Sequence, residues 1–234
     1  MKTVLHIDSS ARPGGSEVAT YGSHTRRLSG RFMRKWRERR QDDRVLCRDV
    51  GLNPPTPVSA QWIHAAFTPP TDRTLWMEAV LHESDMLVDE LISADIIVAG
   101  VPMYNFSVPA QFKAYIDNVV RVGRTFGFDR ARSGEPYWPL LSEMNKKLII
   151  LSSRGDFGYD PSGRVADQNH VEASIRTAFA YIGITDVQSI AIEYDEFADE
   201  RLTQSIQAAE NAVDALVAGL TTQSEMRINA DALV

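Results

Sequence analysis

Cysteine is nearly absent from the 234-residue sequence, in which Cys47 stands alone. A single thiol excludes an internal disulfide and a multi-thiolate metal centre, so we expect a cytoplasmic protein without a metal. Cys47 lies in the strand-like run RVLCRDV and is predicted to be a buried small side chain. No apolar run approaches the roughly 18 residues of a membrane span, and MKTVLHIDSS is too short for a signal sequence. We expect no membrane association.

An excess of basic residues is also lacking, because 25 Lys and Arg face 31 Asp and Glu, for a net charge of −6. This balance gives no reason to expect a nucleic acid partner. The exception is the basic stretch RRLSGRFMRKWRERR, residues 26–40. Leu28, Phe32 and Trp36 recur there every four residues, which predicts an amphipathic helix with a basic solvent face.

Neither a Walker A pattern nor G-x-G-x-x-G occurs in the chain, which argues against a P-loop NTPase and a glycine-rich dinucleotide site. Apolar strand-like runs alternate instead with helical patterns, which predicts an α/β fold with a doubly wound, five-stranded parallel sheet in three layers. One domain spans residues 1–220, and a mobile tail spans 221–234. Strands are predicted at 3–8, 44–50, 95–101, 146–153 and 187–194, helices at 26–40, 76–93, 108–122, 171–183 and 198–220, an irregular segment at 51–74 and a long excursion at 123–145.

Ligands of such sheets bind at the carboxyl ends of the strands, where three loops have distinct chemistry. The loop SSARPGGSEVATYGSHT is rich in hydroxyls and leads into a helix, so it suits a phosphate, with Ser9, Ser23 and Thr25 as donors. Helix capping by Ser23 is the simpler alternative. Either Ser16 or Ser23 meets the phosphate.

The other two loops suit a flat ligand. PMYNF follows the third strand with two aromatic rings, and SRGD follows the fourth with backbone N–H groups. Phosphate donors, an aromatic platform and donors for a ring edge together describe a site for flavin mononucleotide (FMN).

The runs PMYNFSVPAQFKAYIDNVVRVGRTF, LSSRGD and YIGITDV resemble the FMN-dependent NADH azoreductase family of flavodoxin-like NAD(P)H quinone oxidoreductases. The resemblance covers residues 2–220. It implies a flavodoxin-like fold, a homodimer with FMN at its interface, and two-electron reduction of quinones and azo compounds by NADH or NADPH. The flavin carries the hydride chemistry, so no catalytic side chain is expected.

The resemblance also assigns residues to the site. Ser9, Ser23, His24 and Thr25 correspond to the phosphate loop, and Pro102, Met103, Tyr104, Asn105 and Phe106 to the segment along the flavin ring. Ser153, Arg154, Gly155 and Asp156 correspond to the loop at the pyrimidine edge of the flavin. Phe126, Phe128 and Tyr181 correspond to aromatic residues on the substrate side.

Asp156 departs from the family pattern, in which a glycine is usual. A carboxylate facing the pyrimidine edge would make flavin reduction harder, because like charges repel. The alternative is that Asp156 turns outward, caps the loop or pairs with Arg154. Two other functions stay open, a free-flavin reductase and a non-enzymatic electron carrier or flavin sensor.

Overall fold

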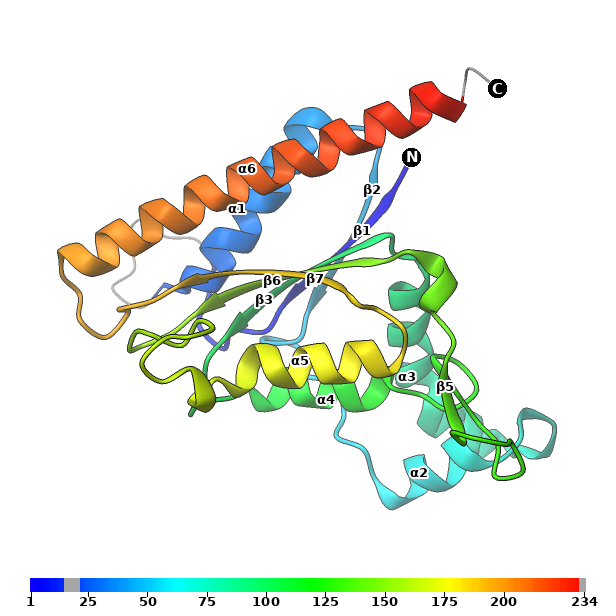
Figure 1. The fold of residues 1–234 in the computed structure, drawn as a ribbon. Coiled ribbons are helices and arrows are strands. Elements are labelled where there is room, and N and C mark those ends of the chain that lie inside the picture. Colours follow the sequence, from blue (N-terminus) through cyan, green and yellow to red (C-terminus); the bar gives the residue numbers. More distant parts are fainter. Residues whose placement is uncertain (15–21, 232–234) are drawn as a thin grey trace.

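The computed structural model describes residues 1–14 and 22–231, with side chains described through residue 222. Figure 1 shows a central sheet with helices on both faces. The strands are β1 (Thr3–Asp8), β2 (Arg44–Asp49), β3 (Ile96–Pro102), β4 (Phe126–Phe128), β5 (Tyr137–Pro139), β6 (Lys147–Ser153) and β7 (Asp186–Ile192). The α-helices are α1 (His24–Arg39), α2 (Ala60–Phe67), α3 (Leu75–Ser93), α4 (Ala110–Val119), α5 (His170–Tyr181) and α6 (Glu200–Asp231).

The main sheet has five parallel strands in the order β2-β1-β3-β6-β7. The order reverses between β1 and β3, so their carboxyl ends open a crevice at this switch point. This arrangement confirms the predicted doubly wound fold.

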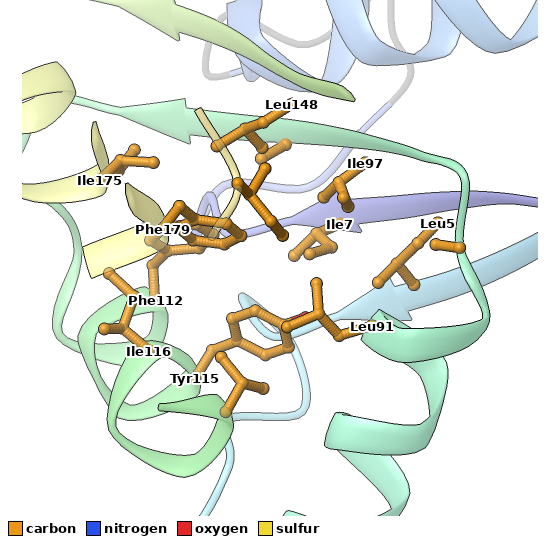
Figure 2. Close-up of a cluster of buried hydrophobic side chains, with 14 of the residues drawn as sticks. Leu5, Ile7, Leu91, Ile97, Phe112, Tyr115, Ile116, Leu148, Ile175 and Phe179 are labelled. Carbon is orange, nitrogen blue, oxygen red and sulfur yellow. The ribbon is translucent and has the colours of Figure 1, made fainter. Parts of the chain in front are cut away.

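Each face of the sheet has its own apolar core. On one face α1 and α6 cover Val4, Val98 and Leu151. On the other, side chains of α3, α4 and α5 pack on β1, β3 and β6, and Figure 2 shows Phe112, Tyr115 and Phe179 directed toward the strands. The β3 and β6 strands are buried on both faces, which explains their continuous apolar sequence.

The segment 51–74 was predicted to be irregular, and this was wrong because it contains α2. The prolines lie on either side of the helix and leave its interior free. Ser59 caps α2 by accepting a hydrogen bond from the backbone N–H of Trp62 at 3.1 Å. Trp62 and Ala65 are buried against Met77 of α3. The described residues therefore contain one more α-helix than predicted.

Two other segments contain more regular structure than predicted. The excursion 123–145 contains a short antiparallel pair in which β4 lies against β5. Helix α6 continues past residue 220, where the helical pattern predicted its end, to Asp231.

Cys47 is exposed, contrary to the prediction of a buried thiol. It lies on β2, an edge strand of the sheet, opposite His6 of β1. Strand order decides this exposure, and strand order cannot be read from the local sequence. Among the described residues, no helix has the length and apolar character needed to cross a membrane.

Candidate functional site

The loop after β1 enters α1 through a serine cap. Ser23 Oγ accepts from the backbone N–H of Arg26 at 3.3 Å and lies 3.0 Å from Thr25 Oγ1. Capping by Ser23 is thus confirmed. The N–H groups of His24 and Thr25 in the first turn have no partner among the described residues, and such groups form the positive end of the helix dipole. Ser16 lies outside the described residues.

Ser9 has a structural contact that its predicted role did not include. The side chain is fully buried, and its Oγ donates to the carbonyl of Gly100 at 2.9 Å. This bond uses the hydroxyl proton of Ser9 to hold the loop against β3, so the proton is not available to a phosphate.

A buried arginine, which sequence reasoning missed, lies beneath this loop. The Arg26 guanidinium donates to both carboxylate oxygens of Asp49 at 2.6 and 2.7 Å and to the carbonyl of Ser10 at 2.8 Å. The hydrogen bond with Asp49 raises the pKa of Arg26. Burial alone would raise the pKa of Asp49, and the bond from Arg26 lowers it. The sequence places Asp49 at a strand end but does not reveal this pairing.

His24 connects the start of α1 to the loop after β7. Its Nε2 lies 3.1 Å from Asp195 Oδ1, and Arg12 Nη1 lies 3.8 Å from the other carboxylate oxygen. The hydrogen bond with His24 lowers the pKa of Asp195. The imidazole predicted for the phosphate loop is therefore held by a carboxylate, while the backbone N–H of His24 has no partner in the part of the chain that the structure describes.

The segment after β3 forms a strained two-residue turn. Tyr104 and Ser107 exchange backbone hydrogen bonds of 2.9 and 3.1 Å. Between them, Asn105 and Phe106 both adopt positive φ angles, 48° and 70°. Such angles are rare for a bulky residue and cost roughly 1–3 kcal/mol each. The N–H groups of Asn105 and Phe106 have no partner among the described residues.

Neighbouring contacts fix the base of this turn. Pro102 is the last residue of β3, and the Met103 N–H donates to the carbonyl of Ser153 at 2.9 Å. The Tyr104 hydroxyl accepts from the backbone N–H of Ala11 at 3.2 Å, which joins this turn to the loop after β1. Phe106 is half exposed. The predicted ring platform therefore lies beside the predicted phosphate loop.

Arg154 points into the protein rather than toward a ligand. Its guanidinium contacts Asp160 at 2.8 Å, Glu193 at 3.0 Å and Glu172 at 2.5 Å. Its backbone N–H donates to Ile192. The side chain and the backbone N–H of Arg154 are thus used within the protein, and its assignment to the cofactor stays a prediction. Its buried ion pairs hold the loop instead.

The other residues of this loop stay available. The N–H groups of Gly155 and Asp156 have no partner among the described residues, and Ser153 ends β6. The Asp156 carboxylate pairs with Arg164 at 2.5 Å, and the hydrogen bond from Arg164 lowers the pKa of Asp156. The Asp156 carboxylate is therefore partly exposed to solvent, and it pairs with Arg164 rather than with Arg154.

The predicted substrate-side aromatic residues come together, but away from these loops. The ring centroid of Phe126 lies 5.1 Å from that of Tyr181, and Phe128 stacks on Tyr137 at 4.7 Å. Burial raises the pKa of Tyr181. His170, the first residue of α5, donates its N–H to Phe106 at 3.0 Å.

Helix α5 separates the two groups of residues. Tyr181 is the last of its 12 residues, so about 16 Å of helix lies between Tyr181 and the turn at Phe106. Among the described residues, the aromatic cluster therefore lies at the opposite end of α5 from the turn at Phe106.

The free backbone donors fit FMN. They occur at the start of α1, in the turn at Asn105 and Phe106, and at Gly155, so three neighbouring loops offer N–H groups to acceptors. A phosphate suits the helix N-terminus, and the carbonyl groups of a flavin ring suit the other two. No group of His, Cys, Asp and Glu suited to a metal ion occurs among the described residues.

The fold and these loops define a flavodoxin-like protein. The chain belongs to the family described as "Flavodoxin-like fold", whose family model matches residues 2–217. A relative from Colwellia psychrerythraea, named FMN-dependent NADH:quinone oxidoreductase 2, is 43% identical over 93% of this chain and 98% of its own. A relative from Opitutus terrae, named FMN-dependent NADH:quinone oxidoreductase, is 39% identical over 93% of this chain and 97% of its own.

Solved structures agree on the fold. An FMN-dependent NADH-azoreductase from Bacillus anthracis, in complex with FMN, has a TM-score of 0.80 at 17% identity and covers 94% of this chain and 100% of its own. Another azoreductase from that organism has a TM-score of 0.79 at 22% identity, covering 93% of this chain and 99% of its own.

Proposed function

We propose that this protein is an FMN-dependent NADH:quinone oxidoreductase that also accepts azo compounds. The observation that carries the proposal is the strained turn at Asn105 and Phe106, which keeps two backbone N–H groups free at the carboxyl end of β3. Strained backbone conformations of this kind cluster at active sites and ligand-binding segments. The names of the relatives at 43% and 39% identity support the same activity.

The residues of three loops would hold FMN. The first turn of α1, at Ser23, His24 and Thr25, would bind the phosphate, and the turn at Asn105 and Phe106 would donate to the ring. The N–H groups of Gly155 and Asp156 would meet the pyrimidine edge. When bound, FMN supplies the two-electron chemistry that moves a hydride from NADH to the acceptor. Position and electrostatics are the contribution of the chain.

One pocket would serve donor and acceptor in turn, because the matched family domain occupies nearly the whole chain. This predicts ping-pong kinetics.

We also propose a cytoplasmic homodimer. Within one chain, about 16 Å of helix separates the aromatic cluster around Tyr181 from the turn at Phe106. In a dimer, the cluster of one subunit can lie against the three loops of the other. Exposed apolar side chains on and after α2, including Phe67 and Trp76, support an interface.

The proposal is tested with purified protein incubated with FMN. We expect a yellow protein that releases FMN and not FAD on denaturation, and steady NADH oxidation that depends on a quinone. Double-reciprocal lines should be parallel. NADH consumption with free FMN but not with quinone would identify a free-flavin reductase, and bound flavin without turnover would identify an electron carrier or sensor.

A further inference from the structure

A second group of aromatic rings borders the candidate FMN site, in the segments that follow β6 and β7. The backbone N–H groups of residues 194–196 donate to the carbonyls of residues 154–156 at 3.1–3.3 Å. In the same segment, Asp195 contacts His24 at the start of α1. Residues 194–197 therefore lie beside both the pyrimidine-edge loop and the phosphate loop.

The group, here called the ring stack, comprises Phe157, Tyr194 and Phe197 with Arg164 and Arg201. The rings of Phe157 and Tyr194 stack with centroids 4.8 Å apart and planes 15° apart, and Phe197 meets both edge-on. The Arg164 guanidinium carbon lies 4.6 Å from the Phe157 centroid. That of Arg201 lies 5.4 Å from the Tyr194 centroid and 4.3 Å from the Phe197 centroid. Planar groups are thus layered from Arg164 to Arg201.

The ring stack is not part of the core. The side chains of Arg164 and Arg201 are 51% and 50% exposed, and Phe197 is 38% exposed. Tyr194 has a positive φ of 69°, which is costly for a bulky residue. The rings are therefore covered by one another and by the two arginines, and the planes left half exposed are the guanidinium groups at the two ends of the stack.

Carboxylates balance the charge of the two arginines. Asp156 binds Arg164 at 2.5 Å, and Asp199 binds Arg201 at 2.6 Å. The ring stack therefore offers planar faces beside hydrogen-bond acceptors, with little net charge. A neutral nucleoside suits this surface better than an additional phosphate, which the carboxylates would repel.

We infer that the ring stack receives the adenosine end of NADH and selects NADH over NADPH, an inference that rests on the proposed function. Purine rings stack on aromatic and guanidinium planes. A carboxylate beside the ribose accepts from its hydroxyl groups and disfavours the 2′-phosphate of NADPH. Asp199, which pairs with Arg201 at one end of the stack, is the carboxylate placed for this discrimination.

The test compares NADH with N-benzyl-dihydronicotinamide, a donor that lacks adenosine, using the FMN-loaded enzyme and a quinone. Phe197→Ala and Arg201→Ala should each raise the KM for NADH on the order of 5- to 30-fold, the range expected for a lost stacking contact. Rates with the benzyl donor should stay within about twofold of wild type. Arg27→Ala is the matched control, because Arg27 is equally exposed and paired with Glu210 but contacts no ring among the described residues.

Equal losses with both donors, or an unchanged KM for NADH, would overturn the inference. Asp199→Asn should lower the KM for NADPH relative to that for NADH by about 3- to 10-fold, since a charge that repels the phosphate is removed; an unchanged ratio would overturn the selection of NADH. A wild-type enzyme that neither donor reduces would contradict the proposed function itself.

Discussion

Two buried arginines have the same role in two loops of the candidate site. Arg26 lies beneath the phosphate loop and binds Asp49, and Arg154 lies beneath the pyrimidine-edge loop and binds Glu172 and Glu193. Each arginine fixes the conformation of its loop through contacts inside the protein. The loop can then present its backbone N–H groups to a ligand, and the arginine side chain does not take part in that contact. These buried guanidinium groups therefore position the loops and do not bind the ligand themselves, because their hydrogen bonds and ion pairs are formed within the protein.

Arg154→Lys should destabilise the protein and weaken FMN binding. Lysine keeps the charge, but its ammonium cannot contact Asp160, Glu172 and Glu193 in the planar arrangement of a guanidinium. We expect the free energy of unfolding to fall by about 3 kcal/mol, as for a broken buried ion pair. Urea denaturation measures this loss. Arg164→Lys changes a half-exposed pair and should cost less than about 1 kcal/mol; equal losses in the two variants would contradict the anchoring role.

His6 should make stability depend on pH. Burial alone lowers the pKa of His6, but the Asp8 carboxylate 3.3 Å from its Nε2 and the neighbouring Cys47 raise it to about 9, from about 6.5 in the unfolded chain. The folded state therefore favours the proton. Its contribution is fully present below pH 6.5 and is lost as the pH rises through about 9.

Denaturation of wild type and His6→Gln from pH 6 to pH 10 tests this linkage. The difference in unfolding free energy should shrink with rising pH by on the order of 2–3 kcal/mol. His82→Gln, which replaces an exposed histidine of α3, should follow the wild-type profile. A difference that is constant across this range would show that His6 does not bind its proton more tightly in the folded state.

At the scale of elements, α2 depends on one arginine from outside the helix. Arg121 is fully buried, donates to Ser84 Oγ at 2.8 Å and lies 5.3 Å from the ring of Trp62 in α2. Burial lowers its pKa to about 10. Its Nε and Nη2 have no hydrogen-bond partner among the described residues. Arg121 therefore supports α2 more by its volume than by its charge.

The comparison of two substitutions tests this role. Arg121→Ala should lower the unfolding free energy by about 3 kcal/mol, since it leaves a cavity beneath Trp62. Arg121→Met fills the space without a charge and should stay within about 1 kcal/mol of wild type. Arg124→Ala, which removes a partly exposed partner of Asp85, should cost less than about 1 kcal/mol. A methionine variant as unstable as the alanine variant would show that the charge is required.

At the scale of the whole molecule, the alternation of apolar strands with helical patterns was enough to predict the five-stranded parallel sheet. It did not predict α2, because the prolines around that helix signal irregular structure and the buried contacts of Trp62 are long-range. The exposure of Cys47 depended on strand order, which becomes visible only when β2 lies at the edge.

For the candidate site, the sequence predicted which loops take part but not how their side chains are directed. Motifs located the three loops, since the carboxyl ends of parallel strands meet at one edge. They did not give side-chain direction, so Arg154 was expected at the ligand, although its guanidinium is buried and paired with Glu172, Glu193 and the exposed Asp160. They also did not give the distance between Phe106 and Tyr181, which the length of α5 sets.

This separation of Tyr181 from the three loops leads to a prediction about the assembly. If a partner subunit supplies the aromatic cluster, Asn105→Pro and Tyr181→Ala damage different parts of a shared site. Proline cannot adopt the φ of 48° found at Asn105 and lacks the N–H group, so this variant should lose FMN. Tyr181→Ala should keep FMN and lose most of its quinone reduction.

Mixing the two variants under conditions that exchange subunits should restore activity. Half of the random dimers then combine one copy of each, and each has one intact site, so about a quarter of wild-type activity should return. Light scattering should give about twice 26.1 kDa for every sample. A site built within one chain would stay damaged in both copies, because each carries a substitution. Mixed dimers verified by mass that regain no activity would therefore place the aromatic cluster outside the site.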